Sequence, residues 1–217
     1  GEIDRLMQYI TDTDIPICAK ESTIAWLLVL YNVIVPNRLP TDIVRRTEEG
    51  KPYIYGFPFN LSHDYPNVAL FVDRINFNNN IGVDMVRMNI DYAVHELRSM
   101  FDPIEWFYIL IDRSMFPIYW SLKEAYIKAI GCGLEIEGGL SSLVFHFRNA
   151  IHANNVWFSP LYVTHLGKRL DNFHFYTMKY TLIRDNTAIS LCSQTPIKAL
   201  KVQTLDVITF INKVKVS

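Results

Sequence analysis

The chain has 217 residues, of which 50% are hydrophobic, 13% aromatic and 20% charged, and its formal net charge is −1. This composition supplies enough apolar side chains for a packed core and excludes a disordered, collagen-like or disulfide-stapled chain. The near-neutral charge gives no long-range attraction to nucleic acid or to an anionic membrane, so we expect neither as a partner. At ~150 residues per domain, the length allows one large domain or two small ones.

The cysteine usage indicates a reducing compartment. Cys18, Cys132 and Cys192 are widely spaced and form no CxxC pair. Free thiols of this kind are typical of cytosolic proteins, so we expect a cytoplasmic location. The longest apolar run, residues 24–35, contains Asn32. It is shorter than the ~20 residues that a bilayer requires, so it predicts no membrane span.

The first predicted elements are a helix and a hairpin. The apolar pattern of residues 20–35 predicts a buried helix whose role is core packing, and residues 41–46 predict a short helix or turn. The chain then contains β-rich runs at 68–72 and 81–85. The turn-forming segment 76–80 lies between these runs, so we expect them to pair as a hairpin.

The second half repeats the order of helices followed by strands. Residues 91–110 and 117–130 predict helices, and Pro103 is suited to the first turn of a helix that starts there. Strands are predicted at 161–166, 173–182 and 188–192. This order indicates an α+β fold of two similar halves, residues 1–90 and 91–217.

One strand carries an unexpected carboxylate. Side chains alternate along a strand, so Asp84 shares a face with Gly82 and Val86 in the run 81–86. A carboxylate among apolar and small residues is costly to bury unless it is paired or binds a cation. The alternative is an aspartate that caps a turn at the strand end.

The predicted helix 117–130 carries a second polar group. Glu124 and Lys128 are four residues apart and project together, opposite an apolar stripe formed by Leu122, Ala125, Tyr126 and Ala129. A solvated salt bridge is the simplest interpretation of this pair. Trp120 and Ile127 lie on either side of it, which favours the wall of a cleft instead.

A third group combines basic and short polar side chains. Arg46 and Lys51 can hold phosphate groups, Arg through paired hydrogen bonds and Lys as a point charge. Asn60, Ser62 and His63 follow in a presumed strand. Solvated loop charge is the alternative for the basic residues, and an isolated histidine is more often structural than catalytic.

Together the three groups describe a metal and phosphate site. The carboxylates of Asp84 and Glu124 suit Mg²⁺, which takes one or two carboxylates and the phosphate oxygens of a substrate. Phosphate charge would be offset by Arg46, Lys51, His63 and Lys128. The chain has neither a Walker loop nor a GxGxxG motif, which disfavours P-loop and Rossmann sites.

These residues stand in motifs that resemble the 4′-phosphopantetheinyl transferases. The likeness is to the larger, pseudo-dimeric, surfactin-synthetase-activating type, and within it to the eukaryotic branch that activates aminoadipate-semialdehyde dehydrogenase. It runs from about residue 19 to about residue 147. The motifs that carry it are RTEEGKP at 46–52, FNLSH at 59–63, GVD at 82–84, FDPIEW at 101–106 and YWSLKEAYIKAIGCGL at 119–134.

The resemblance implies a fold, a reaction and a set of roles. Two pseudo-symmetric halves would enclose an active site in the cleft between them. The enzyme would move the phosphopantetheine arm of coenzyme A to a serine of an apo carrier protein and release adenosine 3′,5′-bisphosphate. Asp84 and Glu124 would bind Mg²⁺, Glu124 would accept the serine proton directly or through water, and Lys128 would contact the phosphates.

The remaining roles concern coenzyme A. By resemblance, His63 joins Lys128 at the phosphates, and Arg46 and Lys51 hold the phosphoadenosine. Asn60 and Ser62 line the same site, and Lys123 assists beside Glu124; the set that binds coenzyme A is therefore Arg46, Lys51, Asn60, Ser62, His63, Lys123 and Lys128.

Two departures from the family pattern leave an alternative open. Bacterial relatives carry an acid at the position of Val86, and the family's early arginine has no clear counterpart, since Arg5 fits poorly by spacing. The alternative is a module that binds carrier protein and coenzyme A but is catalytically impaired. Intact Asp84, Glu124 and Lys128 favour the enzyme.

The expected protein partners are apo carrier domains. Aminoadipate reductase of lysine biosynthesis, fatty acid synthase and secondary-metabolite synthases are all candidates. We expect docking near the apolar segment 97–116, which Arg98 and Arg113 flank, because carrier domains are typically acidic. The alternative is that these apolar side chains all pack inward. Two halves in one chain make a monomer sufficient.

Overall fold

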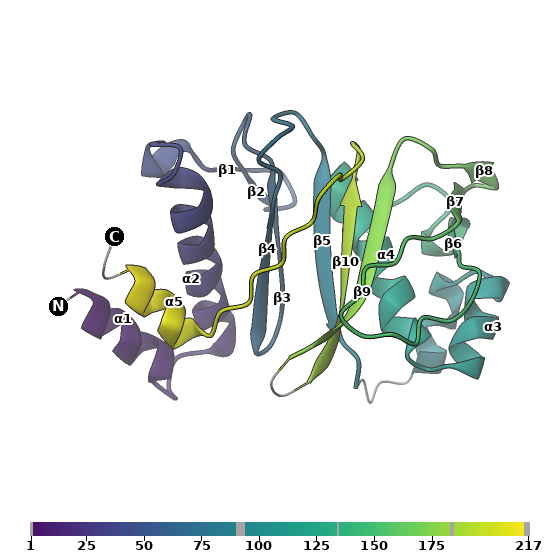
Figure 1. The fold of residues 1–217 in the computed structure, drawn as a ribbon, viewed down its shortest axis with the longest axis horizontal. Helices are drawn as coiled ribbons and strands as arrows, with labels where there is room; N and C mark the ends of the chain where they lie inside the picture. Colours follow the sequence, from purple (N-terminus) through teal and green to yellow (C-terminus); the bar gives the residue numbers. More distant parts are fainter. Residues whose placement is uncertain (1, 90–93, 134, 183–184, 215–217) are drawn as a thin grey trace.

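Helices and strands are mixed along the computed structural model, which describes residues 2–89, 94–133, 135–182 and 185–214 (Figure 1). The N-terminal elements are α1 (Glu2–Thr11), α2 (Ile17–Val29), the π-helical turn η1 (Leu30–Ile34), the 3₁₀ turn η2 (Thr41–Ile43), β1 (Arg45–Arg46), β2 (Pro52–Tyr53), β3 (Phe59–Asp64), β4 (Asn67–Val72) and β5 (Ile81–Arg87). The C-terminal elements are the 3₁₀ turn η3 (Val94–Met100), α3 (Pro103–Ile111), α4 (Met115–Ile130), the 3₁₀ turn η4 (Leu140–Ser142), β6 (Leu143–His146), β7 (Tyr162–His165), β8 (Lys168–Arg169), β9 (His174–Thr181), β10 (Asn186–Ser193) and α5 (Val207–Val214). The α+β class is confirmed.

The strands pair differently from the sequence-based expectation. Within the described residues they form antiparallel sheets with the orders β1–β2, β3–β4, β5–β10–β9 and β6–β7–β8. The expected hairpin of 68–72 with 81–85 is wrong, because β4 pairs with β3, and β5 pairs with β10. The turn segment 76–80 connects two sheets instead. Turn chemistry is local, whereas the partner of β5 lies in a distant part of the chain.

Helix α2 covers the β3–β4 hairpin, and helix α4 covers the β5–β10–β9 sheet. In Figure 1 the β3–β4 hairpin lies between α2 and the β5–β10–β9 sheet. The helix α2 and the turn after it pack on the hairpin, and their shared core is Val29, Val33, Ile34, Ile54 and Phe59. The helix α4 packs on the β5–β10–β9 sheet within the larger core, whose members include Leu122, Ala125, Phe175, Ala188 and Cys192.

The helical stretch Ile17–Ile34 is long and apolar enough to cross a membrane by length and composition. The sequence-based expectation counted only the apolar run 24–35, which is shorter. A core helix of a globular protein meets the same test. Of this stretch 22% is buried, namely Ile24, Val29, Val33 and Ile34, and α2 packs against the β3–β4 hairpin.

The ends of α3 and α4 follow local sequence signals. Asp102 caps α3 by accepting a hydrogen bond from the Ile104 amide at 2.9 Å, and Glu105 accepts from the Asp102 amide at 3.2 Å. This capping box and Pro103 at the first turn confirm the predicted start. Gly131 ends α4 with a φ of 70°, a conformation that glycine adopts without strain.

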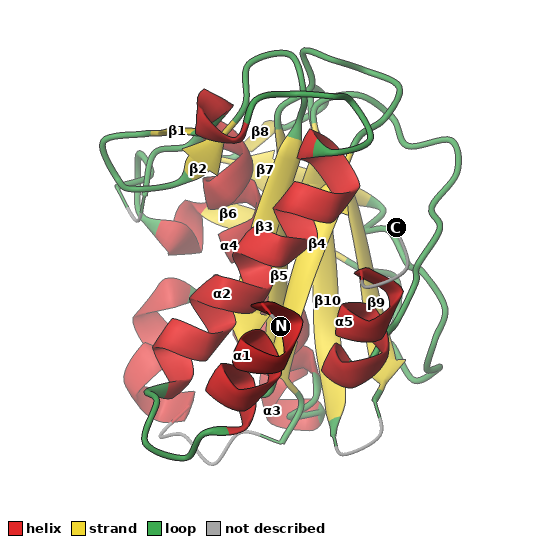
Figure 2. Ribbon diagram, turned by 90° about the vertical axis from the view of Figure 1, so that its left-hand side faces the viewer, coloured by secondary structure: helices red, strands yellow, loops and turns green. Residues whose placement is uncertain are grey.

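Some elements had no clear signal in the sequence. The terminal helices α1 and α5 lie side by side next to α2 (Figures 1 and 2), and Phe210 of α5 contacts Tyr31.

The expected boundary at residue 90 and the motif residue Leu134 fall outside the described residues. Because β5 joins a sheet with β10 and β9, that sheet combines both expected halves. The pseudo-symmetry of the halves stays a prediction.

Candidate active site

The candidate site lies where β3 meets the outer edge of β5. Three side chains on one face of β3 accept hydrogen bonds from three backbone amides of β5: Asn60 from Val83 at 2.8 Å, Ser62 from Met85 at 3.2 Å and Asp64 from Arg87 at 2.7 Å. We call this line of contacts the seam. Alternate residues on both strands take part, so the seam fixes their register. Polar side chains thus replace the backbone partner that this edge of β5 lacks.

Asp84 is a buried carboxylate beside the seam that contacts Ser62 and Lys128. Its Oδ1 atom accepts a hydrogen bond from Ser62 at 3.0 Å and lies 2.7 Å from Nζ of Lys128. Nζ of Lys128 also donates to the carbonyl of Val83 at 3.1 Å. Burial raises the pKa of Asp84, and the contacts with Lys128 and Ser62 oppose that shift. The predicted face of β5 is confirmed, since Asp84 points toward α4.

A glycine brings α4 close to this strand. A Cβ atom on Gly82 would lie 1.9 Å from the Ala125 carbonyl oxygen and 2.8 Å from the Ala129 amide nitrogen. Only glycine therefore fits where α4 crosses β5. The contact places the turn of α4 that carries Glu124 and Lys128 directly beside the strand that carries Asp84.

Glu124 completes a group of three charges. Its side chain is half-buried on α4, one turn before Lys128. Burial raises the pKa of Glu124, and the negative charge of Asp84 raises it further, while Lys128 opposes both effects. Two carboxylates and one ammonium group from two elements therefore interact at the seam, as the sequence predicts.

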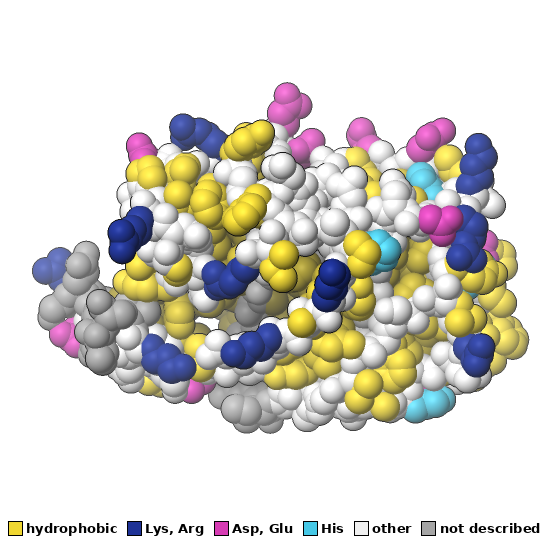
Figure 3. Space-filling view, turned by 45° about the horizontal axis from the view of Figure 1, so that its top comes forward, with side chains coloured by type: hydrophobic (Ala, Val, Ile, Leu, Met, Phe, Trp, Pro, Cys, Tyr) yellow, Lys and Arg dark blue, Asp and Glu magenta, His cyan; other side chains and the backbone are white. Residues whose placement is uncertain are grey.

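Lys51 adds a second cation. Its Nζ atom donates to the backbone carbonyl of Lys128 at 2.5 Å, which joins the β1–β2 loop to the end of α4. Burial and the nearby charge of Lys128 lower the pKa of Lys51. Arg46 is exposed and donates to the Gly50 carbonyl at 2.8 Å, so it holds the loop that carries Lys51. Figure 3 shows basic side chains scattered over the face viewed.

His63 points away from the three charges. It follows Ser62 on β3, so its side chain lies on the opposite face of the strand. Its Nδ1 atom is 3.0 Å from a carboxylate oxygen of Glu21 on α2. The side chain is 64% exposed. The structure does not bring His63 into the Asp84 group, and its contact with phosphate stays a prediction.

The structure corrects the role predicted for Lys123. The family resemblance implies that Lys123 assists Glu124 and contacts coenzyme A, but its side chain is 0% exposed. Its ammonium group donates to the carbonyl oxygens of Leu140 and Leu143 and pairs with Glu105. Successive helix residues point about 100° apart, so a neighbour of Glu124 in sequence faces the core. The prediction that Lys123 contacts coenzyme A directly is therefore wrong.

The donor set fits one hard divalent cation. Asp84 and Glu124 provide two carboxylates whose raised pKa values reflect negative charge held without enough solvent. Within the described residues, three or more potential ligands of the His, Cys, Asp or Glu type come together nowhere. A pair of carboxylates suits Mg²⁺, which completes its shell with water and phosphate oxygens. Val86 shares the Asp84 face but offers no ligand.

The fold and this site define a family. The model of the 4′-phosphopantetheinyl transferase superfamily matches residues 80–192, which include Asp84, Glu124 and Lys128. The match covers more than half of the chain, and the chain belongs to this superfamily. Arg46, Lys51, Asn60, Ser62 and His63 lie outside the matched range.

Named relatives agree with the family. The chain is 33% identical over 133 residues to a phosphopantetheinyl transferase of Thraustochytrium sp., which covers 49% of this chain and 45% of the relative. It is 31% identical over 139 residues to the L-aminoadipate-semialdehyde dehydrogenase-phosphopantetheinyl transferase of Xenopus laevis, covering 52% and 44%. It is 29% identical over 125 residues to the 4′-phosphopantetheinyl transferase gsp of Aneurinibacillus migulanus, covering 54% and 51%. These alignments span about half the length of each relative.

Proposed function

We propose that this protein transfers the 4′-phosphopantetheine arm of coenzyme A to a serine of an apo carrier-protein domain. The observation that carries the proposal is the buried Asp84 carboxylate, bonded to Lys128 and close enough to Glu124 to raise its pKa, within the range that matches the superfamily. Membership of the superfamily and the names of the relatives support the same reaction.

The reaction requires a proton acceptor and positive charge. The serine oxygen attacks the phosphorus that carries the pantetheine arm, and a new P–O bond forms. The bond from that phosphorus to the bridging oxygen breaks, so adenosine 3′,5′-bisphosphate leaves with the electron pair. Glu124 takes the serine proton, directly or through water, because a carboxylate within reach of the hydroxyl can act as a general base. Lys128 and Lys51 offset the phosphate charge.

We propose that Asp84 and Glu124 hold Mg²⁺ when coenzyme A is bound. The ion would supply charge neutralisation at the diphosphate. Ser62 holds the Asp84 carboxylate, and its own position is set by the Met85 amide. The side-chain oxygen of Asn60 accepts a hydrogen bond from the Val83 amide, so Asn60 belongs to the seam. We propose that its side-chain nitrogen donates to coenzyme A.

We propose that the carrier domain docks on α3. Of the apolar side chains in the segment 97–116, Phe101, Trp106, Met115 and Phe116 pack inward. A second set is exposed along α3 and consists of Ile104, Phe107, Leu110 and Ile111. Arg113 lies exposed at the end of this surface, whereas Arg98 donates to the Phe101 carbonyl and stacks on Trp106. An acidic amphipathic carrier domain complements such a surface.

The reaction is tested by its released product. The protein is incubated with coenzyme A and an apo acyl carrier protein, with Mg²⁺ or with a chelator, and adenosine 3′,5′-bisphosphate is measured by chromatography. We expect release that requires both Mg²⁺ and the carrier. Release without Mg²⁺ would contradict the metal role, and coenzyme A binding without release would indicate a binding module.

A further inference from the structure

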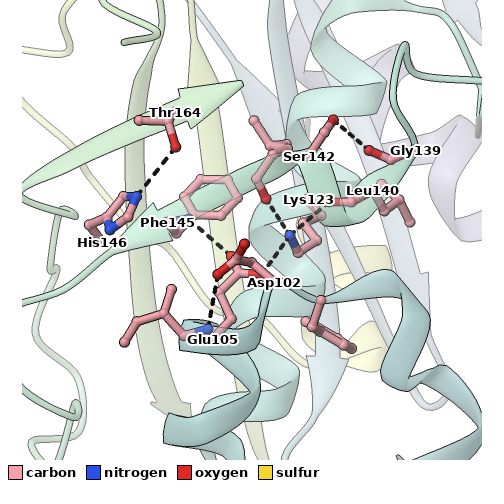
Figure 4. A network of polar contacts seen from close by, with 12 residues as sticks. Asp102, Glu105, Lys123, Gly139, Leu140, Ser142, Phe145, His146 and Thr164 are labelled. Carbon is pink, nitrogen blue, oxygen red and sulfur yellow. Dashed lines mark hydrogen bonds and ion pairs between the residues drawn. The ribbon is translucent and has the colours of Figure 1, made fainter. Parts of the chain in front are cut away.

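A buried ion pair lies in the core next to the proposed site and takes no part in the steps above. Lys123 and Glu105 are both 0% exposed, and Nζ lies 2.8 Å from Oε2 (Figure 4). Lys123 is the residue before Glu124 on α4, and Glu105 is in the first turn of α3. Burial raises the pKa of Glu105 and lowers that of Lys123, and their mutual attraction opposes both shifts.

Each charged group has all of its partners. Nζ of Lys123 donates to the Leu140 carbonyl at 2.9 Å and to the Leu143 carbonyl, besides its contact with Glu105. Glu105 accepts from the Phe145 amide at 2.9 Å through Oε1, and from the Asp102 amide. The pair therefore joins the start of α3, the middle of α4 and the segment that enters β6 (Figure 4). Such a network fixes one geometry, because no apolar side chain can satisfy the same groups.

The helix α4 is also held from its other side. Lys128 contacts Asp84, and Ser121 contacts Ser190 of β10 at 2.6 Å. At 3.6 residues per turn, Lys123 and Lys128 point about 140° apart, whereas Glu124 and Lys128 point only about 40° apart. Contacts on opposite sides of a helix resist its rotation. The Lys128 contact lies on the side of α4 that faces the site, and the Lys123 contact lies on the other side. Together they limit rotation of the helix about its axis.

We infer that Lys123 and Glu105 are positioning residues that fix the rotation of α4 and so aim Glu124 at the seam. The inference rests on the proposed function. When Lys123 loses its contacts, α4 loses the polar anchor on the side away from the site, and Glu124 spends less time in the productive orientation. Lys128 has a long side chain with two anchors of its own, so kcat falls more than the KM for coenzyme A rises.

The test compares Lys123→Met with two other variants. Lys123→Met leaves Glu105 unpaired in the core, which is destabilising, so the double variant Lys123→Met/Glu105→Gln removes both charges and keeps an amide oxygen for the Phe145 amide. The control is Lys179→Met, which removes another buried lysine whose Nζ donates to Ser114 at 2.6 Å at the start of α4. Activity is measured well below each melting temperature and normalised to folded protein.

We expect the double variant to fold and to lose about 10²-fold in kcat, because small misplacements of a reacting group have effects of that size. Its KM for coenzyme A changes little, and hydrogen exchange of the α4 amides speeds up. Lys179→Met loses stability but keeps kcat. A folded double variant with the kcat of the parent protein overturns the inference. A parent protein that transfers nothing to apo acyl carrier protein or apo peptidyl carrier domain overturns the proposed function instead.

Discussion

At the scale of single residues, the carboxylates of Asp84 and Glu124 lie near the ammonium group of Lys128. Of these two carboxylates, Lys128 contacts that of Asp84. Lys128 contacts Asp84 at 2.7 Å, whereas Glu124 is influenced mainly by burial and by the charge of Asp84. Both carboxyl pKa values are raised. A cation that enters between the carboxylates would remove this electrostatic cost, which is the physical reason for assigning Mg²⁺ to these two groups.

Glu124→Gln is expected to abolish transfer while the helix persists, because glutamine is a comparable helix former and the apolar stripe is unchanged. We expect kcat to fall by at least about 10²-fold, the usual effect of losing a general base. Glu137→Gln, an exposed change, serves as the control. Retention of more than roughly a tenth of the parent turnover would be incompatible with the assigned base.

The same variant tests the electrostatics through stability. A carboxylate with a raised pKa in the folded chain destabilises it at neutral pH, and this cost disappears as the pH falls toward the pKa of the unfolded chain. Without metal, Glu124→Gln should therefore melt at or above the temperature of the parent protein at pH 7. Mg²⁺ should raise the melting temperature of the parent protein more than that of the variant. Equal rises would show that Glu124 is no metal ligand.

Lys128→Ala should affect coenzyme A more than the carrier protein. Its ammonium group is assigned to phosphate, and it also holds Asp84 and the Val83 carbonyl. We expect the KM for coenzyme A to rise and kcat to fall, as steady-state kinetics would measure. If only the KM for the carrier protein rises, Lys128 belongs to the docking surface.

At the scale of elements, the site depends on how closely α4 crosses β5. Gly82 allows this approach because its missing Cβ would otherwise overlap the Ala125 carbonyl oxygen. The seam then holds β3 to the outer edge of β5 through Asn60, Ser62 and Asp64. The groups that we propose as catalytic are thus brought together by contacts of backbone atoms with small or polar side chains.

Gly82→Ala should therefore damage both stability and activity. Overpacking of a core commonly costs about 1–3 kcal/mol, and we expect the upper part of that range because the clashing atoms belong to the backbone. Thermal unfolding should show a melting temperature lower by about 5–10 °C. Truncating Ala125 to glycine in the same chain should not rescue it, since the clash is with the carbonyl oxygen. Rescue would show that side-chain crowding is the cause.

Local signals predicted the helices α2, α3 and α4 and the face of Asp84, but not the terminal helices or the strand partners. The capping residues of α3, the glycine after α4 and the alternation along β5 are all encoded within a few residues. The pairing of β5 with β10 depends on segments far apart in the chain. The same limit explains Lys123, because its acceptors on Leu140 and Leu143 follow only from the packing of α3, α4 and β6.

At the scale of the whole molecule, the β3–β4 hairpin and the sheet that contains β5 provide the two sides of the site, and α3 lies on the far side of α4 from that hairpin (Figure 1). The proposed transfer reaction requires a protein substrate as well as coenzyme A. The exposed apolar side chains of α3 are where we propose that this substrate docks.

Charge reversal at Arg113 tests the docking surface. Arg113→Glu should raise the KM for an acidic carrier protein at low salt, and this effect should shrink as ionic strength rises. Coenzyme A binding should not change, because Arg113 is not part of the Asp84 group. The reversal of Arg98 is less informative, since that side chain also holds the Phe101 carbonyl. Unchanged carrier kinetics at low salt for Arg113→Glu would place docking elsewhere.

The most direct measurement is the intact mass of an apo carrier protein after incubation with this chain, coenzyme A and Mg²⁺. We predict a gain of one phosphopantetheine group on the carrier serine with the parent protein and with the surface control Asp171→Asn, and no gain with Asp84→Ala. A carrier that keeps its apo mass with the parent protein, while coenzyme A still binds, would contradict the proposed transfer reaction. An equal gain with Asp84→Ala would contradict the placement of the active site at the seam.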